Sequence, residues 1–114
     1  RAAISAKAKE GQDSAVAEIK RLWEKVAAGN AIHYLNDGLA NLADDGQRLH
    51  FLTEAYAFIR ALQYNSFGNI DASDVQDILT ALGDNFWTVT EEEIEYARDL
   101  LAAKAGLESV KTDL

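Results

Sequence analysis

The chain has 114 residues, of which 48% are hydrophobic, and it contains neither cysteine nor proline. This length suits one folded domain, and the missing cysteines exclude disulfides, thiol nucleophiles and thiolate metal sites. The net charge of −8 lies wholly in residues 61–114, which carry three basic and eleven acidic residues, so we expect no nucleic-acid partner.

The first forty residues predict helices with two apolar stripes. Residues 1–11 are alanine-rich and end at Gly11, and the next helix opens at Asp13 or Ser14. Its half-buried stripe consists of Ile19, Leu22, Trp23 and Val26. The helix either ends at Gly29-Asn30 or continues as one long, gently rotating helix. In the second case it carries a further stripe of Ile32, Leu35, Leu39 and Leu42.

Three more helices follow, separated by short turns. Residues 43–47 form a turn, and the helix predicted over 48–64 has an apolar face of Leu49, Leu52, Ala55, Tyr56, Ile59 and Leu62. After a turn at 65–69, one helix runs from the N-cap Asp71 to Gly83, and another from Thr90 to Gly106, each opened by a capping box.

These elements predict an all-α fold, an antiparallel bundle of about five helices with short loops. Residues 1–114 are expected to form a single helical domain or the C-terminal fragment of a larger one, because Arg1 is not a translation start. The tail at 107–114 is expected to be loose, and no segment is apolar enough to span a membrane.

Both histidines have a carboxylate four residues later, on the same helical face. The pairs are His33 with Asp37 and His50 with Glu54, and together they offer four ligands for a metal ion. The competing interpretation is structural. His33 is then hydrogen-bonded between helices, and His50 with Glu54 forms a partly exposed pair.

Residues 63–74 have the outline of a calcium-binding loop but not its chemistry. Gln63 stands where a carboxylate is needed, Phe67 stands at a ligand position, and Asp74 replaces the terminal bidentate glutamate, so we expect no calcium site. The chain also has no nucleophile motif and no glycine-rich phosphate loop, so we expect no enzyme.

Several strings resemble the C-terminal part of an uncharacterised helical family of the bacterial cell envelope, found beside imelysin-like, iron-regulated proteins. The strings are WEKVAAGNAIHYLNDGL, EAYAFIRALQYN and ILTALGD, together with the opening RAAI. The positions that match are Trp23, His33, Tyr34, Asn36, Glu54, Phe58, Gln63, Tyr64, Asn65, Gly83 and Asp84. The sequence departs from the family pattern at 44–53, and this weakens the transfer of any ligand role from the family to His50.

The resemblance implies a periplasmic or lipid-anchored protein with a binding role in iron or haem acquisition. Together with His33 and Glu54, it makes iron, zinc or haem the candidate ligand. It implies a partner that is either its own N-terminal portion or another envelope protein. It also implies a structural polar core, formed by Trp23, Tyr34, Asn36, Gln63, Tyr64 and Asn65. An alternative is a structural or protein-interaction module in which buried polar residues fix helix packing. A third, by analogy with neighbouring proteins, is an imelysin-like hydrolase.

Overall fold

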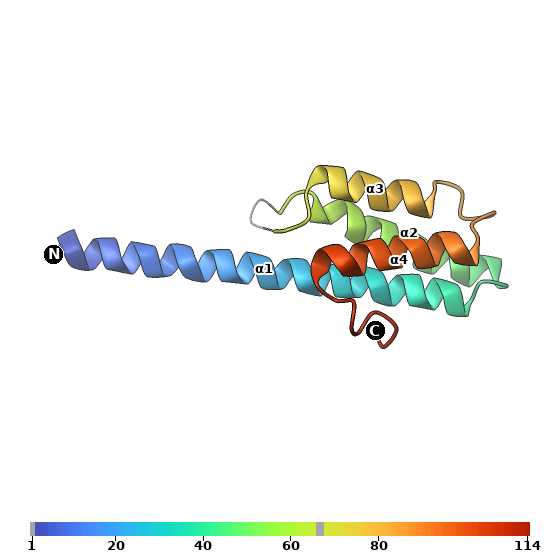
Figure 1. The fold of residues 1–114 in the computed structure, drawn as a ribbon, viewed down its shortest axis with the longest axis horizontal. Coiled ribbons are helices and arrows are strands. Elements are labelled where there is room, and N and C mark those ends of the chain that lie inside the picture. Colours follow the sequence, from blue (N-terminus) through green and yellow to red (C-terminus); the bar gives the residue numbers. More distant parts are fainter. Residues whose placement is uncertain (1, 66–67) are drawn as a thin grey trace.

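The computed structural model describes residues 2–65 and 68–114, with side chains from Ser5 onward. Four helices follow one another: α1 (Ala2–Ala40), α2 (Asp45–Leu62), α3 (Ala72–Leu82) and α4 (Glu91–Ala105) (Figure 1). The all-α prediction is confirmed, and the described residues contain no strand. The turn predicted at 65–69 and the family element at residues 1–4 lie partly outside the described residues.

The number of helices is four rather than about five, because the first two predicted segments form one helix of 39 residues. Gly11 does not end it. A glycine inside an exposed helix costs only about 1 kcal/mol relative to alanine, and no proline is present to force a break. Gly29 and Asn30 also lie inside α1, so the longer of the two alternatives is the observed one.

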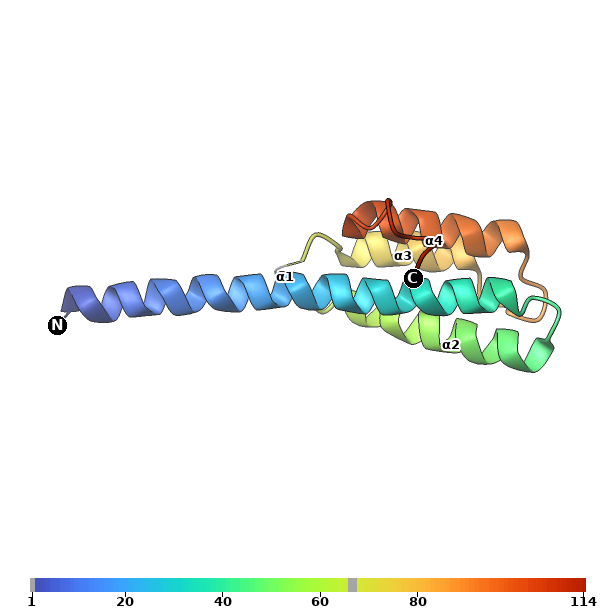
Figure 2. The ribbon, with the colours of Figure 1, turned by 90° about the horizontal axis from the view of Figure 1, so that it is seen from below.

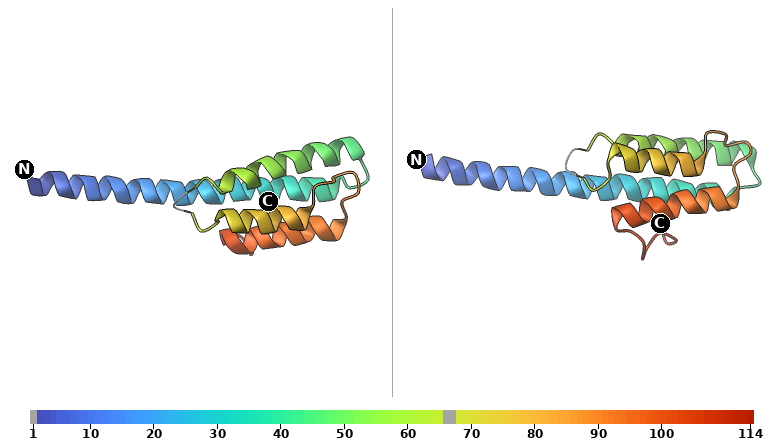
Figure 3. Two further views of the ribbon diagram at one scale, coloured as in Figure 1. Left: turned by 90° about the horizontal axis from the view of Figure 1, so that it is seen from above. Right: turned by 45° about the horizontal axis from the view of Figure 1, so that its top comes forward.

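The four helices form a bundle around the C-terminal half of α1 (Figures 2 and 3). α1 packs against α2 and α4, and α3 packs against α4 and α2. The core is aliphatic, and its largest fully buried side chains are Ile32, Leu35, Leu52, Ile59, Leu62, Ile70, Ile78, Leu82, Ile94 and Leu101.

Side-chain caps set the starts of the three shorter helices. Asp71 and Thr90 form the predicted capping boxes with Asp74 and Glu93. α2 begins three residues earlier than predicted, because the Asp44 side chain accepts from the backbone N–H of Gln47 and caps the helix there. No helix in the described part of the chain has the length and hydropathy needed to cross a membrane.

The N-terminal half of α1 projects beyond the bundle as an arm, defined here as residues 5–22 (Figure 1). The molecule is therefore elongated, with extents of 64 × 25 × 22 Å. The prediction of a half-buried stripe on this segment is wrong, because Ile19, Leu22, Trp23 and Val26 are 64%, 55%, 46% and 62% exposed.

The two predicted stripes of α1 lie on nearly opposite sides of the helix, not on one gently rotating face. At about 100° per residue, Ile19 and Val26 fall on one side, whereas Ile32 and Leu35 fall on the other. Ile32 and Leu35 are fully buried in the bundle. The arm consequently exposes an apolar surface that its own bundle does not use.

Candidate functional site

The four candidate metal ligands lie on two helices. On α1, His33 Nε2 lies 3.3 Å from Asp37 Oδ2, and the His33 side chain is 53% exposed. On α2, the exposed His50 ring lies against Phe51, at 5.3 Å between centroids, and Glu54 is half-buried. In the described part of the chain, no three His, Asp or Glu side chains lie close enough together to hold a metal ion. The structure therefore forms one pair but does not bring the two pairs into one site.

Tyr34 belongs to an aromatic stack between α1 and α2. Its ring lies 5.8 Å from that of Phe58 and 6.3 Å from that of Phe51, and both pairs are stacked. Offset aromatic pairs at these distances add to the energy of burial. Tyr34 and Phe58 thus join two helices.

Asn36 holds the C-terminal tail against α1. Its Nδ2 donates to the carbonyl of Lys111 at 2.8 Å and to that of Leu114 at 3.2 Å, while its Oδ1 accepts from Arg98 at 3.2 Å. Asp99 pairs with Arg98 and Lys111. Burial raises the pKa of Asp99, but the hydrogen bonds from Lys111 and Arg98 outweigh it and hold the pKa below its usual value. The tail that was expected to be loose is fastened to α1 by these contacts.

Two of the residues expected in a polar core are not buried. Trp23 is 46% exposed on the outer side of α1, and Tyr64 is 78% exposed just after α2. Gln63 is the C-cap residue of α2. Asn65 Nδ2 donates to the Lys20 carbonyl of α1 at 2.8 Å. These four residues therefore do not form one buried polar core. Two lie on the surface, and two lie at the end of α2, where Asn65 contacts the backbone of α1.

Glu24 is a buried carboxylate that the sequence analysis missed. It is 3% exposed and accepts from the backbone N–H groups of Asn69 and Ile70, at 3.0 and 3.2 Å. Gly68 is required beside it, because a Cβ there would lie 1.6 Å from Glu24 Oε2. Helical spacing carries the signal, since Glu24 lies four residues before the buried Ala28 on the bundle side of α1.

Arg48 is a second missed residue, at the opposite end of the bundle. It is 5% exposed and donates to the carbonyls of Phe86, at 3.0 Å, and Trp87, at 3.3 Å. It also donates to the Leu42 carbonyl and pairs with Asp45 at 2.6 Å. One guanidinium thereby ties the 85–89 loop to the turn between α1 and α2. No local pattern predicts this, because the loop partners lie almost forty residues away.

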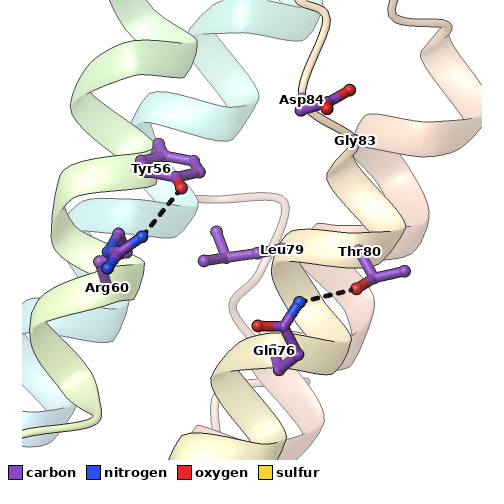
Figure 4. A pocket seen from close by; sticks show the side chains of 7 residues that line it. All are labelled: Tyr56, Arg60, Gln76, Leu79, Thr80, Gly83 and Asp84. Carbon is purple, nitrogen blue, oxygen red and sulfur yellow. Dashed lines mark hydrogen bonds between the residues drawn. The ribbon is translucent and has the colours of Figure 1, made fainter.

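A cleft of about 370 Å³ opens between α2 and α3 (Figure 4). Arg60 and Tyr56 line one wall, and the hydrogen bond to the Tyr56 hydroxyl, 3.2 Å long, raises the pKa of the Arg60 guanidinium. The other wall comes from α3 and its C-terminal end, where Gln76 donates to the Thr80 hydroxyl at 3.3 Å. None of the lining residues forms a nucleophile–base pair.

The outer side of α1, from the arm to the start of the bundle, carries a large exposed apolar surface, which we call the outer stripe. It consists of Val16, Ile19, Leu22, Trp23 and Val26, each at least 42% exposed. Towards the bundle it leads into a groove of about 440 Å³ between α1 and the tail. The groove is lined by Lys25, Val26, Gly29, Asn30, His33, Leu107 and Leu114. Contiguous apolar patches of this kind mark interaction sites.

Comparison with known proteins gives one match. No curated protein and no solved structure matches the chain. A family model described as "Domain of unknown function (DUF4856)" matches residues 1–108. Because this match covers nearly the whole sequence, the chain belongs to the DUF4856 family.

Proposed function

We propose that this protein is a binding module rather than an enzyme, and that it contacts another protein through the outer stripe of α1. The observation that supports this is the position of the stripe. Ile19 and Val26, 64% and 62% exposed, lie on the side of α1 that faces away from its own bundle. Side chains that contribute nothing to the bundle core are available for a partner.

The length of the arm adds a second argument. Most of the stability of a helix in a protein comes from packing of its apolar face against other elements, not from the helix alone. From Ser5 to Val16 every residue of α1 is exposed. A partner covering the outer stripe would supply the missing tertiary contacts.

A matched pair of substitutions tests whether the stripe is dispensable for folding. Ile19→Asp is expected to leave the thermal unfolding of the bundle within a few degrees of wild type, because Ile19 is 64% exposed. Leu35→Asp is expected to unfold the domain, because Leu35 is fully buried. Equal losses in the two variants would show that the stripe belongs to the protein's own core.

Photo-crosslinking tests the interaction itself. A benzophenone amino acid at position 22, on the outer stripe, is compared with one at Asp77, which is exposed on α3. We expect a discrete protein adduct in cells at position 22, lost when Val26→Lys is added, and none at position 77. Either a second copy or a different protein in the adduct supports the proposed function. No adduct at position 22 argues against it.

The groove beside His33 supports a second candidate, a ligand site on the same surface. His33 stands at its edge with Asp37 at 3.3 Å, next to Val26, Leu107 and Leu114. The iron or haem link that the resemblance implies stays a prediction, and zinc is the third candidate ligand. Calorimetric titration of wild type and His33→Ala with each of the three tests it, and binding that the substitution leaves unchanged would rule out this site.

The envelope location is likewise a proposal that rests on the resemblance. Fractionation of the organism that produces the protein tests it directly. Recovery in the periplasmic or membrane fraction is expected, and recovery with cytoplasmic markers would contradict it.

A further inference from the structure

We propose that the outer face of α1 pairs with the same face of a second copy of this chain, as an antiparallel two-stranded coiled coil. This inference rests on the proposed function and names the partner. It stands on three observations: the spacing of the outer-face residues, the charges beside them, and the groove that continues the stripe.

The outer face of α1 follows a heptad repeat. Residues spaced alternately by four and three positions line it: Ala8, Gln12, Ala15, Ile19, Leu22, Val26, Gly29 and His33. This is the spacing of the core positions of a coiled coil. None of the eight is buried by the protein's own bundle. Along this seam the β-branched residues Ile19 and Val26 lie on either side of Leu22. Ala15 is small enough to let a second helix approach closely.

The residues that flank this seam distinguish the two possible orientations. Glu18 and Lys25 precede Ile19 and Val26 on one flank, and Val16 and Trp23 follow Ala15 and Leu22 on the other. In an antiparallel pair, each flank meets the same flank of the second copy.

In the antiparallel arrangement, therefore, Glu18 meets the second copy's Lys25, and Val16 meets the second copy's Trp23. In a parallel pair the charged flank would face the apolar flank instead, and Glu18 would lie against Trp23 of the second copy. The intrachain pair of Glu18 with Arg21, at 3.9 Å and with both side chains more than 60% exposed, is too weak to prevent this exchange. Charge and apolar complementarity both favour the antiparallel form.

The register is set by which seam residues of the two copies pack against each other. When Ile19 packs against the second copy's Leu22, Val26 packs against the second copy's Ala15. Residues 8–16 of the second copy then lie over the groove of about 440 Å³ between α1 and the tail. This segment presents mainly small side chains to the groove, with Ala8 and Ala15 at the seam. The groove therefore continues the seam on each copy and is filled by the arm of the other.

The area of the paired stripes is close to that of a specific dimer. The five side chains of the outer stripe are 42–64% exposed. A symmetric pair of stripes would bury on the order of 1,000 Å², and the two grooves add to this, which approaches the roughly 1,200 Å² at which stable interfaces begin. The two bundles lie at opposite ends of the paired helices, so they do not obstruct each other.

Sedimentation velocity over the micromolar range tests the pairing, with circular dichroism as the check on folding. We expect a concentration-dependent dimer that is lost in Ile19→Asp and retained in Tyr96→Asp, a control that changes a large exposed side chain on α4. A chain that is monomeric throughout, or a dimer that Ile19→Asp leaves intact, overturns the proposal.

Charge reversal tests the orientation. Glu18→Lys is expected to raise the dissociation constant about tenfold, and Glu18→Lys/Lys25→Glu is expected to restore it. Because the chain has no cysteine, single-cysteine variants are unambiguous. A mixture of Glu18→Cys and Lys25→Cys chains should form the mixed disulfide. Gln12 is a seam position far from the two-fold axis of this register, so its two copies meet only in a parallel pair. Efficient self-linking of Gln12→Cys, or no rescue by the double reversal, would overturn the antiparallel pairing.

The outcome also separates this inference from the proposed function. A monomeric chain that still gives an adduct with a different protein at position 22 refutes the self-pairing and leaves the interaction role standing. A monomeric chain with no adduct at that position refutes both.

Discussion

Replacing glycine by alanine is expected to have opposite effects at two positions of α1. Gly38 lies where α1 crosses α2, and a Cβ there would come within 2.8 Å of Leu52 Cδ2 and 3.2 Å of its Cγ. Leu52 is fully buried, so it has no free space into which to move. Gly29 lies in the same helix, and a Cβ there meets no atom within 4 Å.

The magnitudes follow from two terms. Alanine in place of glycine inside a helix stabilises by about 0.5–1 kcal/mol, through the lower backbone entropy of the unfolded chain. Forcing an extra methyl group into a filled core costs about 1–3 kcal/mol. Gly29→Ala is thus expected to raise the free energy of unfolding by about 0.5–1 kcal/mol, because only the first term applies. Gly38→Ala is expected to lower it by about 1 kcal/mol, because the second term dominates.

Urea denaturation followed by circular dichroism measures both variants. One low protein concentration is used throughout, because any self-association would add to the apparent stability. Gly11→Ala provides a further control, since its Cβ also meets nothing within 4 Å. If Gly38→Ala proves as stabilising as Gly29→Ala, then α1 and α2 do not approach as closely as the structure indicates, and the packing argument fails.

Three further predictions concern polar side chains. Arg48→Met is expected to lower the free energy of unfolding by about 3 kcal/mol in urea titrations, because it leaves loop carbonyls without a buried donor; a change below about 1 kcal/mol would contradict the anchoring role. Asn36→Leu should release residues 107–114, giving faster tryptic cleavage after Lys111, and an unchanged rate would argue against the fastening. The hydrogen bond from Lys104, at 2.7 Å, and that from the backbone of Asp71 hold the pKa of Asp74 below its ordinary value of 3.8. Its contribution to stability is present above that value and is lost as the pH falls through the lowered pKa. Thermal unfolding of Lys104→Met across the acid range should therefore show a shallower loss than wild type, and an identical profile would contradict the pairing.

The features that sequence predicts well are those set by neighbouring residues. Asp71 with Asp74, and Thr90 with Glu93, form the expected capping boxes, because a cap depends only on residues three positions apart. The apolar face of α2 is also largely correct, since Leu52, Ala55, Ile59 and Leu62 are all buried.

The features that sequence does not predict depend on distant residues. Arg48 binds carbonyls 38 and 39 residues away, and Asn36 binds one 75 residues away. Nothing in the local spacing distinguishes these polar side chains from exposed ones. The hypothesis of a four-ligand metal site also depends on distant residues. The i, i+4 spacing places His33 beside Asp37, but it does not predict how α1 and α2 lie relative to each other.

Sequence periodicity predicts correctly which residues share the outer face of α1, but it wrongly predicts that this face is half-buried. Periodicity identifies which residues share a helix face, not what covers that face. The spacing of a core-facing helix is present at Ile19, Leu22, Trp23 and Val26, but the bundle leaves these side chains exposed.

The separation of the two faces along α1 has a direct experimental consequence. Glu24 and Ala28 face the bundle, whereas Leu22 and Val26, only two positions away from each, face outward. Because the two sets lie on nearly opposite sides of one helix, changes in one should leave the other intact. At a protein concentration low enough to keep the chain monomeric, stability can therefore be measured independently of association. Additive effects in a double variant such as Gly38→Ala/Ile19→Asp would confirm that the helix carries two separate functions, whereas strong coupling would mean that the arm and the bundle fold as one unit.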